Sequence, residues 1–116
     1  MFTPVKHDER LEAYASLTVR VGANVEAGQL VYVFANVENV PLVRAIVREA
    51  YRAGARYVHT FFGDRHHRRA QIEHGAEDSL GFSPPQLVGW IESMREERPA
   101  VISLHGDAEP DLFGDL

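Results

Sequence analysis

The stretch that decides the fold is LVYVFANVENVPLVRAIVREAYRAGARYVHTFF, residues 30–62. It opens at residues 30–35 with an apolar run rich in β-branched and aromatic side chains, typical of a strand covered on both faces. It closes at residues 57–62 with a second run of the same kind, YVHTFF. Between them lies a helical repeat that Gly54 ends. The stretch therefore predicts a strand, a helix and a second strand that lies parallel to the first.

The helix inside this stretch is the clearest element of the sequence. Asn39 stands where a helix cap is expected, and Gly54 stands where the helix should stop. Apolar residues recur between them at helical spacing, at Leu42, Val43, Ile46, Val47, Ala50 and Tyr51.

Another helix is predicted before the stretch. Thr3-Pro4 supplies a cap and a first-turn proline, and Gly22 ends the segment. The apolar face is predicted from the spacing i, i+3, i+4 and i+7, at Leu11, Tyr14, Ala15 and Thr18.

Two helices and a strand are predicted after the stretch. The first helix covers residues 65–74, with Asp64 as its cap and Gly75 as its end. The second helix starts at Ser83-Pro84 and ends before Pro99, and residues 100–104 (AVISL) form the last strand. The second helix has an apolar face at Leu87, Trp90, Ile91 and Met94.

Strands that alternate with helices predict an α/β fold. We expect residues 1–116 to form one three-layer α/β/α domain with a small, mainly parallel sheet of about three strands. Ligands of such folds bind beyond the carboxyl ends of the strands. Here those ends are Asn36-Val37-Glu38, Gly63-Asp64 and His105-Gly106-Asp107.

Composition narrows the class of protein. The 116 residues are 45% hydrophobic and 25% charged, as in a globular domain of ordinary size. No cysteine is present, which excludes disulfides, thiolate metal sites and cysteine nucleophiles. The net charge of −5 argues against a nucleic-acid partner. The sequence has neither a membrane-spanning apolar run nor the apolar core of a signal peptide, so we expect a cytoplasmic protein with no membrane partner.

A histidine-rich stretch, GDRHHRRAQIEHG at residues 63–75, invites a metal interpretation. On a helix, His67 and His74 would lie roughly 10.5 Å apart along the axis, too far for one ion to bridge. The i+4 partners of His66 and His67 are Ala70 and Gln71, which are not metal ligands. The spacing therefore disfavours a metal site.

The same stretch allows an anion site or a surface helix. Gly63 precedes a helix N-terminus, where backbone N–H groups and the helix dipole attract anions, and Arg65 and Arg68 add positive charge. However, Asp64 would already place a carboxylate there, and it could pair with Arg68 at i, i+4.

A basic helix on an acidic chain can also face another domain. We expect a contact with a second domain or subunit from four residues: Arg65, Arg68, Arg69 and His74. Neither a catalytic nor a metal-ligating residue is assigned to this chain.

Residues 11–59 carry a resemblance to a known family. Matching positions are Leu11, Tyr14, Ala15, Leu17, Val19, Gly22, Asn24, Val25, Gly28, Gln29, Val31, Val33, Ala50, Tyr51, Gly54, Ala55 and Val58. The pattern resembles the opening of the thermophilic metalloaminopeptidase family, the aminopeptidase T and leucyl aminopeptidase S type. Gly28-Gln29 and the Ala-Gly-Ala segment at residues 53–55 are its most specific parts.

The resemblance implies a two-domain enzyme that removes N-terminal amino acids from peptides with two divalent metal ions, such as zinc, cobalt or magnesium. The metal ligands and catalytic groups of the family lie in a C-terminal domain, so none is carried over to this chain. The resemblance therefore implies an N-terminal domain that lacks its catalytic domain and is inactive alone. Its implied partners are that domain, a peptide substrate of the parent enzyme and a second copy in a homodimer. A stand-alone small-molecule-binding or dimerising α/β module is the alternative.

Overall fold

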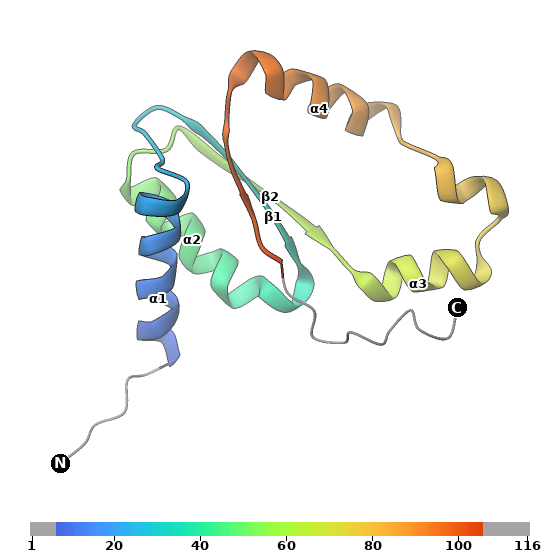
Figure 1. Ribbon diagram of the computed structural model, residues 1–116, viewed down its shortest axis with the longest axis horizontal. Helices are drawn as coiled ribbons and strands as arrows, with labels where there is room; N and C mark the ends of the chain where they lie inside the picture. Colours follow the sequence, from blue (N-terminus) through green and yellow to red (C-terminus); the bar gives the residue numbers. More distant parts are fainter. Residues whose placement is uncertain (1–6, 106–116) are drawn as a thin grey trace.

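The computed structural model describes residues 7–105, with side chains from residue 9 onward. The elements, coloured along the chain in Figure 1, are α1 (His7–Leu17), the π-helical turn η1 (Thr18–Gly22), β1 (Leu30–Asn36), the 3-10 turn η2 (Val37–Asn39), α2 (Val40–Arg52), β2 (Tyr57–Gly63), α3 (Arg65–His74), the 3-10 turn η3 (Glu77–Gly81), α4 (Pro85–Glu97) and β3 (Ala100–Ser103). The predicted order of helices and strands is confirmed.

The three strands form one parallel sheet in the order β2-β1-β3. Leu30 of β1 lies opposite Tyr57 of β2, and Val31 lies opposite Ala100 of β3. The apolar run of residues 30–35 is thus the central strand, which explains why it carries almost no polar side chain. The α/β prediction is confirmed.

The core lies between the sheet and α2. Val31 and Val33 of β1 are fully buried, as is Ile46 of α2, and full burial of such side chains stabilises the fold by about 1.5–3 kcal/mol each. α1 packs against α2 (Figure 1). The same cluster takes in Ala15 and Val19 from α1 and η1.

The N-terminal helix buries a narrower stripe than its sequence predicts. Ala15 and Val19 are buried and Leu11 is half-buried, a spacing of i, i+4, i+8. Tyr14, which the helical spacing places on the apolar face, is 56% exposed. Only a strip that faces α2 can be covered, and Tyr14 lies beside it. The predicted start at Thr3-Pro4 lies outside the described residues.

The helix that follows β1 agrees well with its pattern. Val43, Ile46 and Ala50 are buried, whereas Tyr51 is nearly half exposed and its hydroxyl accepts a hydrogen bond from the Val58 N–H at 3.1 Å. Asn39 occupies the cap position of α2. Its side chain caps the preceding turn instead, because Oδ1 accepts from the backbone N–H of Asn36 at 3.1 Å.

Gly54 ends α2 through a conformation that other residues avoid. Its φ is +100°, and a Cβ placed there would lie 3.1 Å from Cα of Ala27. Its carbonyl accepts from the Gly28 N–H at 2.8 Å. The close approach of these two turns accounts for glycine in the Ala-Gly-Ala segment.

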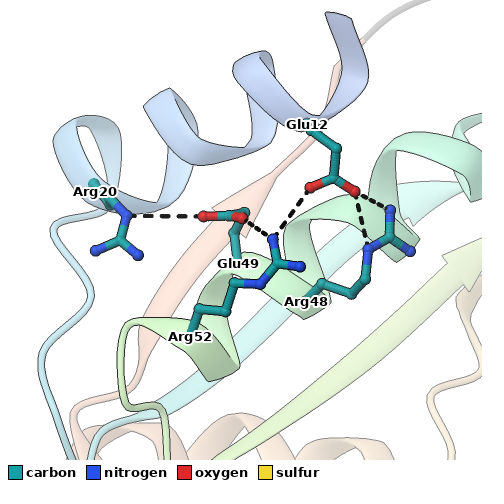
Figure 2. A network of polar contacts seen from close by, with 5 residues as sticks. All are labelled: Glu12, Arg20, Arg48, Glu49 and Arg52. Carbon is teal, nitrogen blue, oxygen red and sulfur yellow. Dashed lines mark hydrogen bonds and ion pairs between the residues drawn. The ribbon is translucent and has the colours of Figure 1, made fainter. Parts of the chain in front are cut away.

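Five charged residues join α1 and η1 to α2 (Figure 2). Arg48 Nε donates to Glu12 at 3.0 Å, and Glu12 also lies 3.5 Å from Arg52. The largely buried Glu49 accepts from Arg52 and lies 3.7 Å from Arg20. The Glu12–Arg52 contact is within ion-pair distance, but Glu12 Oε2 makes no hydrogen bond, so the attraction there is Coulombic.

The second half of the described chain is far less buried. Between Val58 and Ala100, no residue is buried, although the segment includes α3, η3 and α4. The predicted apolar face of α4 exists, but Leu87 is 45% exposed and Ile91 57%. α4 begins at Pro85, and Pro84 rather than Ser83 occupies its cap position. α3 and α4 are therefore much less buried than α2, so the helices on the two faces of the sheet are packed unequally.

Candidate functional site

A cleft of about 890 Å³ lies at the carboxyl edge of the sheet. Its lining includes the residues that end the strands and others from α3 and α4: Phe34, Asn36, Phe61, Gly63, Arg65, Leu87, Leu104 and His105. Three of the predicted strand-end residues, Asn36, Gly63 and His105, are thus brought together. Gly106 and Asp107 lie outside the described residues. This edge is where ligands of parallel α/β sheets bind.

An array of rings covers the face of the sheet that points away from α2. Tyr32 and Phe34 alternate along β1, and His59 and Phe61 alternate at the same level of β2. Phe34 and Phe61 stack with ring centroids 4.6 Å apart, and they form the floor of the cleft. Trp90 reaches this face from α4, with its ring 4.5 Å from His59 and 5.1 Å from Phe61. We call these five residues the aromatic face.

Polar groups in the cleft are few. The Asn36 side chain is engaged by the backbone of Asn39 in the capping box, which leaves Arg65, Ser103 and His105 as the other polar side chains of the lining. In the part of the chain that the structure describes, no three His, Asp or Glu side chains come close enough to hold one ion. These residues therefore do not fit a metal centre.

The basic helix α3 forms as the sequence predicts, from Arg65 to His74. The carboxylate of Asp64 caps it and accepts from the His66 N–H at 3.0 Å. The helix N-terminus is thus already occupied by an anionic group, which disfavours the anion site. Gly75 follows the helix because a Cβ there would lie 2.6 Å from the carbonyl oxygen of Gln71.

The four residues predicted to make a common contact have different surroundings. Arg65 lines the cleft, and Arg69 pairs with Glu73 of its own helix at 2.6 Å. Arg68 donates to Gln71 at 2.7 Å instead of pairing with Asp64 as the spacing predicts. His74 is exposed, 3.4 Å from Glu73. Several charges of α3 are therefore satisfied within the helix.

Sequence reasoning missed the aromatic face. Its signal was present as an alternation of period two, with ring-bearing residues at 32 and 34 and again at 57, 59 and 61. That pattern marks one face of each strand. It becomes a site only when the register places Phe34 beside Phe61.

Among residues 7–105, no helix combines the length and apolar character needed to cross a bilayer.

Comparison with known proteins finds relatives that are named aminopeptidases. The sequence is 33% identical over 109 residues to aminopeptidase 2 of Geobacillus stearothermophilus, covering 94% of this chain and 26% of that protein. It is also 33% identical over 104 residues to aminopeptidase T of Thermus thermophilus, covering 90% of this chain and 26% of that protein. The chain thus spans about a quarter of the length of the curated relatives it matches.

The fold has a close counterpart among solved structures. Wild-type AmpT from Thermus thermophilus superposes with a TM-score of 0.84 at 32% identity, over 96% of this chain and 28% of that one. The family described as thermophilic metalloprotease (M29) matches residues 7–116. These findings confirm the resemblance to the N-terminal domain of the thermophilic metalloaminopeptidases. The chain therefore belongs to the thermophilic metalloprotease (M29) family.

Proposed function

We propose that this chain is the N-terminal, non-catalytic domain of a metal-dependent aminopeptidase that releases N-terminal amino acids from peptides. One observation carries the proposal: the family match extends over residues 7–116, yet the chain spans only about a quarter of its relatives. No three His, Asp or Glu side chains among residues 9–105 lie close enough to hold one ion, so the proposal assigns the metal ligands to the rest of the polypeptide.

The parent enzyme would bind divalent ions, zinc, cobalt or magnesium, with ligands from the rest of its polypeptide. Its substrate would be a peptide and its compartment the cytoplasm. The domain would contribute a folded platform against which the catalytic part is held. In that role, its own residues neither bind metal nor touch the scissile bond.

A peptidase assay tests the proposal. The 116-residue chain and the full-length polypeptide are each incubated with aminoacyl chromogenic substrates and added cobalt, zinc or magnesium. We expect metal-dependent turnover from the full-length polypeptide and none above the blank from the chain alone. Turnover by the chain alone, lost on chelation and regained with metal, would contradict a non-catalytic role.

The cleft at the strand ends favours one other function, a small-molecule-binding module. A ligand that binds only the folded state raises apparent stability by RT ln(1 + [L]/Kd), about 2.7 kcal/mol at a hundredfold excess over Kd. Thermal unfolding in the presence of nucleotides and inorganic phosphate measures this. Under the proposed aminopeptidase role, we expect no rise in the unfolding temperature, and a saturable rise would favour the binding module.

A further inference from the structure

The segment from α3 to α4 exposes large apolar side chains, and two of them, Leu87 and Trp90, lie at the aromatic face. After α3, those at least 38% exposed are Leu80, Phe82, Leu87, Val88, Trp90 and Ile91. In Figure 1, α3 runs outward from the end of β2, and α4 returns toward the start of β3. Apolar side chains gathered in this way mark interaction surfaces in soluble proteins.

The two faces of the sheet differ in how they are covered. On one face, α2 buries Val31 and Val33 completely. On the other face, the ring contacts to α4 all involve Trp90, while Phe34 and Phe61 remain partly exposed in the cleft. Leu87, one helical turn before Trp90, lines this cleft from α4 without closing it. The second face is therefore covered only in part.

We propose that the cleft between Leu87 and the Phe34–Phe61 pair is the surface on which the catalytic part of the same polypeptide docks. The inference rests on the proposed function and adds to it the location of the interface. An apolar element of the catalytic part fills the cleft and covers the exposed side of α4.

Two observations select this occupant. The curated relatives are about four times as long as the part this chain matches, so a much larger body must be held against the domain. Leu104 and His105, the last described residues, line the cleft, so the polypeptide continues from the cleft itself.

The cleft is a better interface than the basic helix. Burial of apolar surface stabilises an interface in proportion to the area removed from water, whereas an exposed ion pair contributes little. Arg69 already pairs with Glu73, and Arg68 already donates to Gln71. A new partner on α3 would have to replace bonds that the helix already makes.

The absence of cysteine from the sequence allows a direct test by labelling. Leu87→Cys places a thiol on the cleft wall. His74→Cys reports on α3, and Val21→Cys, 71% exposed on η1, is the matched control away from the aromatic face. The rate of maleimide labelling at each site is measured in the 116-residue chain and in the full-length enzyme, with peptide mapping to locate the label.

We expect Leu87→Cys to react about tenfold or more slowly in the full-length enzyme, because a label reaches a docked side chain only while the interface is open. His74→Cys and Val21→Cys should react equally in both proteins. Equal rates at Leu87→Cys in an active enzyme would overturn the inference and leave the proposed function standing. Slowing at His74→Cys alone would move the interface to α3. Absence of metal-dependent peptidase activity from the full-length polypeptide would instead contradict the proposed function.

A second copy of the chain is a competing occupant. If the chain dimerised through this cleft, Leu87→Cys would lose reactivity in the isolated chain as its concentration rose, and sedimentation would show a dimer over the same range. We expect labelling of the isolated chain to be independent of concentration. Concentration-dependent labelling of Leu87→Cys, together with a dimer in sedimentation of the unmodified chain that Leu87→Glu abolishes, would overturn docking of the catalytic part.

Discussion

The rings of Phe34 and Phe61 stack almost parallel across β1 and β2, with their centroids 4.6 Å apart and an interplanar angle of 7°. They are directly opposed in the register of the two strands. Aromatic pairs of this kind add about 0.5–1.5 kcal/mol beyond the area they bury. This pair remains half-exposed, so it stabilises the sheet and offers an apolar floor at the same time.

The two faces of the sheet should contribute unequally to stability. We expect Ile46→Ala to lower the free energy of unfolding by about 2–5 kcal/mol, because it opens a cavity in a fully buried site. Phe61→Ala should cost less, about 1–2 kcal/mol, since its ring is partly exposed. Denaturant unfolding of the 116-residue chain measures both changes. Equal costs would mean that the aromatic face is as well covered as the face under α2.

The charged network between α1 and α2 should respond to salt. Glu49→Gln removes the buried carboxylate that holds Arg20 and Arg52, and we expect a loss of about 1 kcal/mol at low ionic strength. The loss should shrink as salt screens the wild-type attraction. Glu92→Gln on the exposed surface of α4 is the control and should change stability little. A salt-independent loss would point to packing instead.

The Arg52 contribution should not vary with pH in the ordinary range. The hydrogen bond and charge of Glu49, followed by the charge of Glu12, raise the pKa of Arg52. A raised pKa gives stability that is present below the unfolded pKa and is lost only as pH rises through the folded pKa. For arginine, both values lie well above the pH range in which the protein is studied. Unfolding of wild type and Arg52→Gln between about pH 7 and about pH 10 should therefore differ by a constant amount.

Two glycine substitutions should change the free energy of unfolding in opposite directions. Gly54→Ala forces a side chain into positive φ and against Ala27, so we expect a loss of more than about 1 kcal/mol. Gly89→Ala lies inside α4 with no atom within 4 Å of the new Cβ, and alanine favours helix by about 0.8–1 kcal/mol. Circular dichroism during unfolding compares the two variants. If Gly89→Ala also destabilised, the free space beside α4 would be in doubt.

The cap of α3 is testable by a matched pair. Asp64→Ala removes the acceptor for the His66 N–H and should cost the helix about 1 kcal/mol. Asp64→Ser keeps a capping oxygen and should cost much less. Amide hydrogen exchange of residues 66–69 gives the local readout. Faster exchange in both variants would show that the carboxylate charge matters more than the hydrogen bond.

Much of the fold was predictable because one stretch is strongly patterned. The continuous apolar run of β1 is typical of a buried strand, and the apolar residues of α2 recur at helical spacing. Gly54 marks the turn between α2 and β2. The exposure of Tyr14 could not be predicted, because a helical repeat gives an apolar side of the helix but not the width that a neighbour covers. The cleft could not be predicted, since it depends on a register that brings Phe34 beside Phe61 and on α4 covering that pair only in part.

The position of β1 between its two partners also sets an order of assembly on the ribosome. β2, which pairs with β1 at Leu30 and Tyr57, is synthesised directly after α2. β3, which pairs with β1 at Val31 and Ala100, is synthesised only after α3, η3 and α4. A nascent chain can close β1, α2 and β2 as soon as residue 63 leaves the exit tunnel. Until residue 103 follows, the central strand keeps one row of backbone hydrogen-bonding groups unpaired, the kind of edge that recruits other chains. A pause in translation between residues 63 and 103 would prolong the time for which this edge of the nascent chain is open to aggregation.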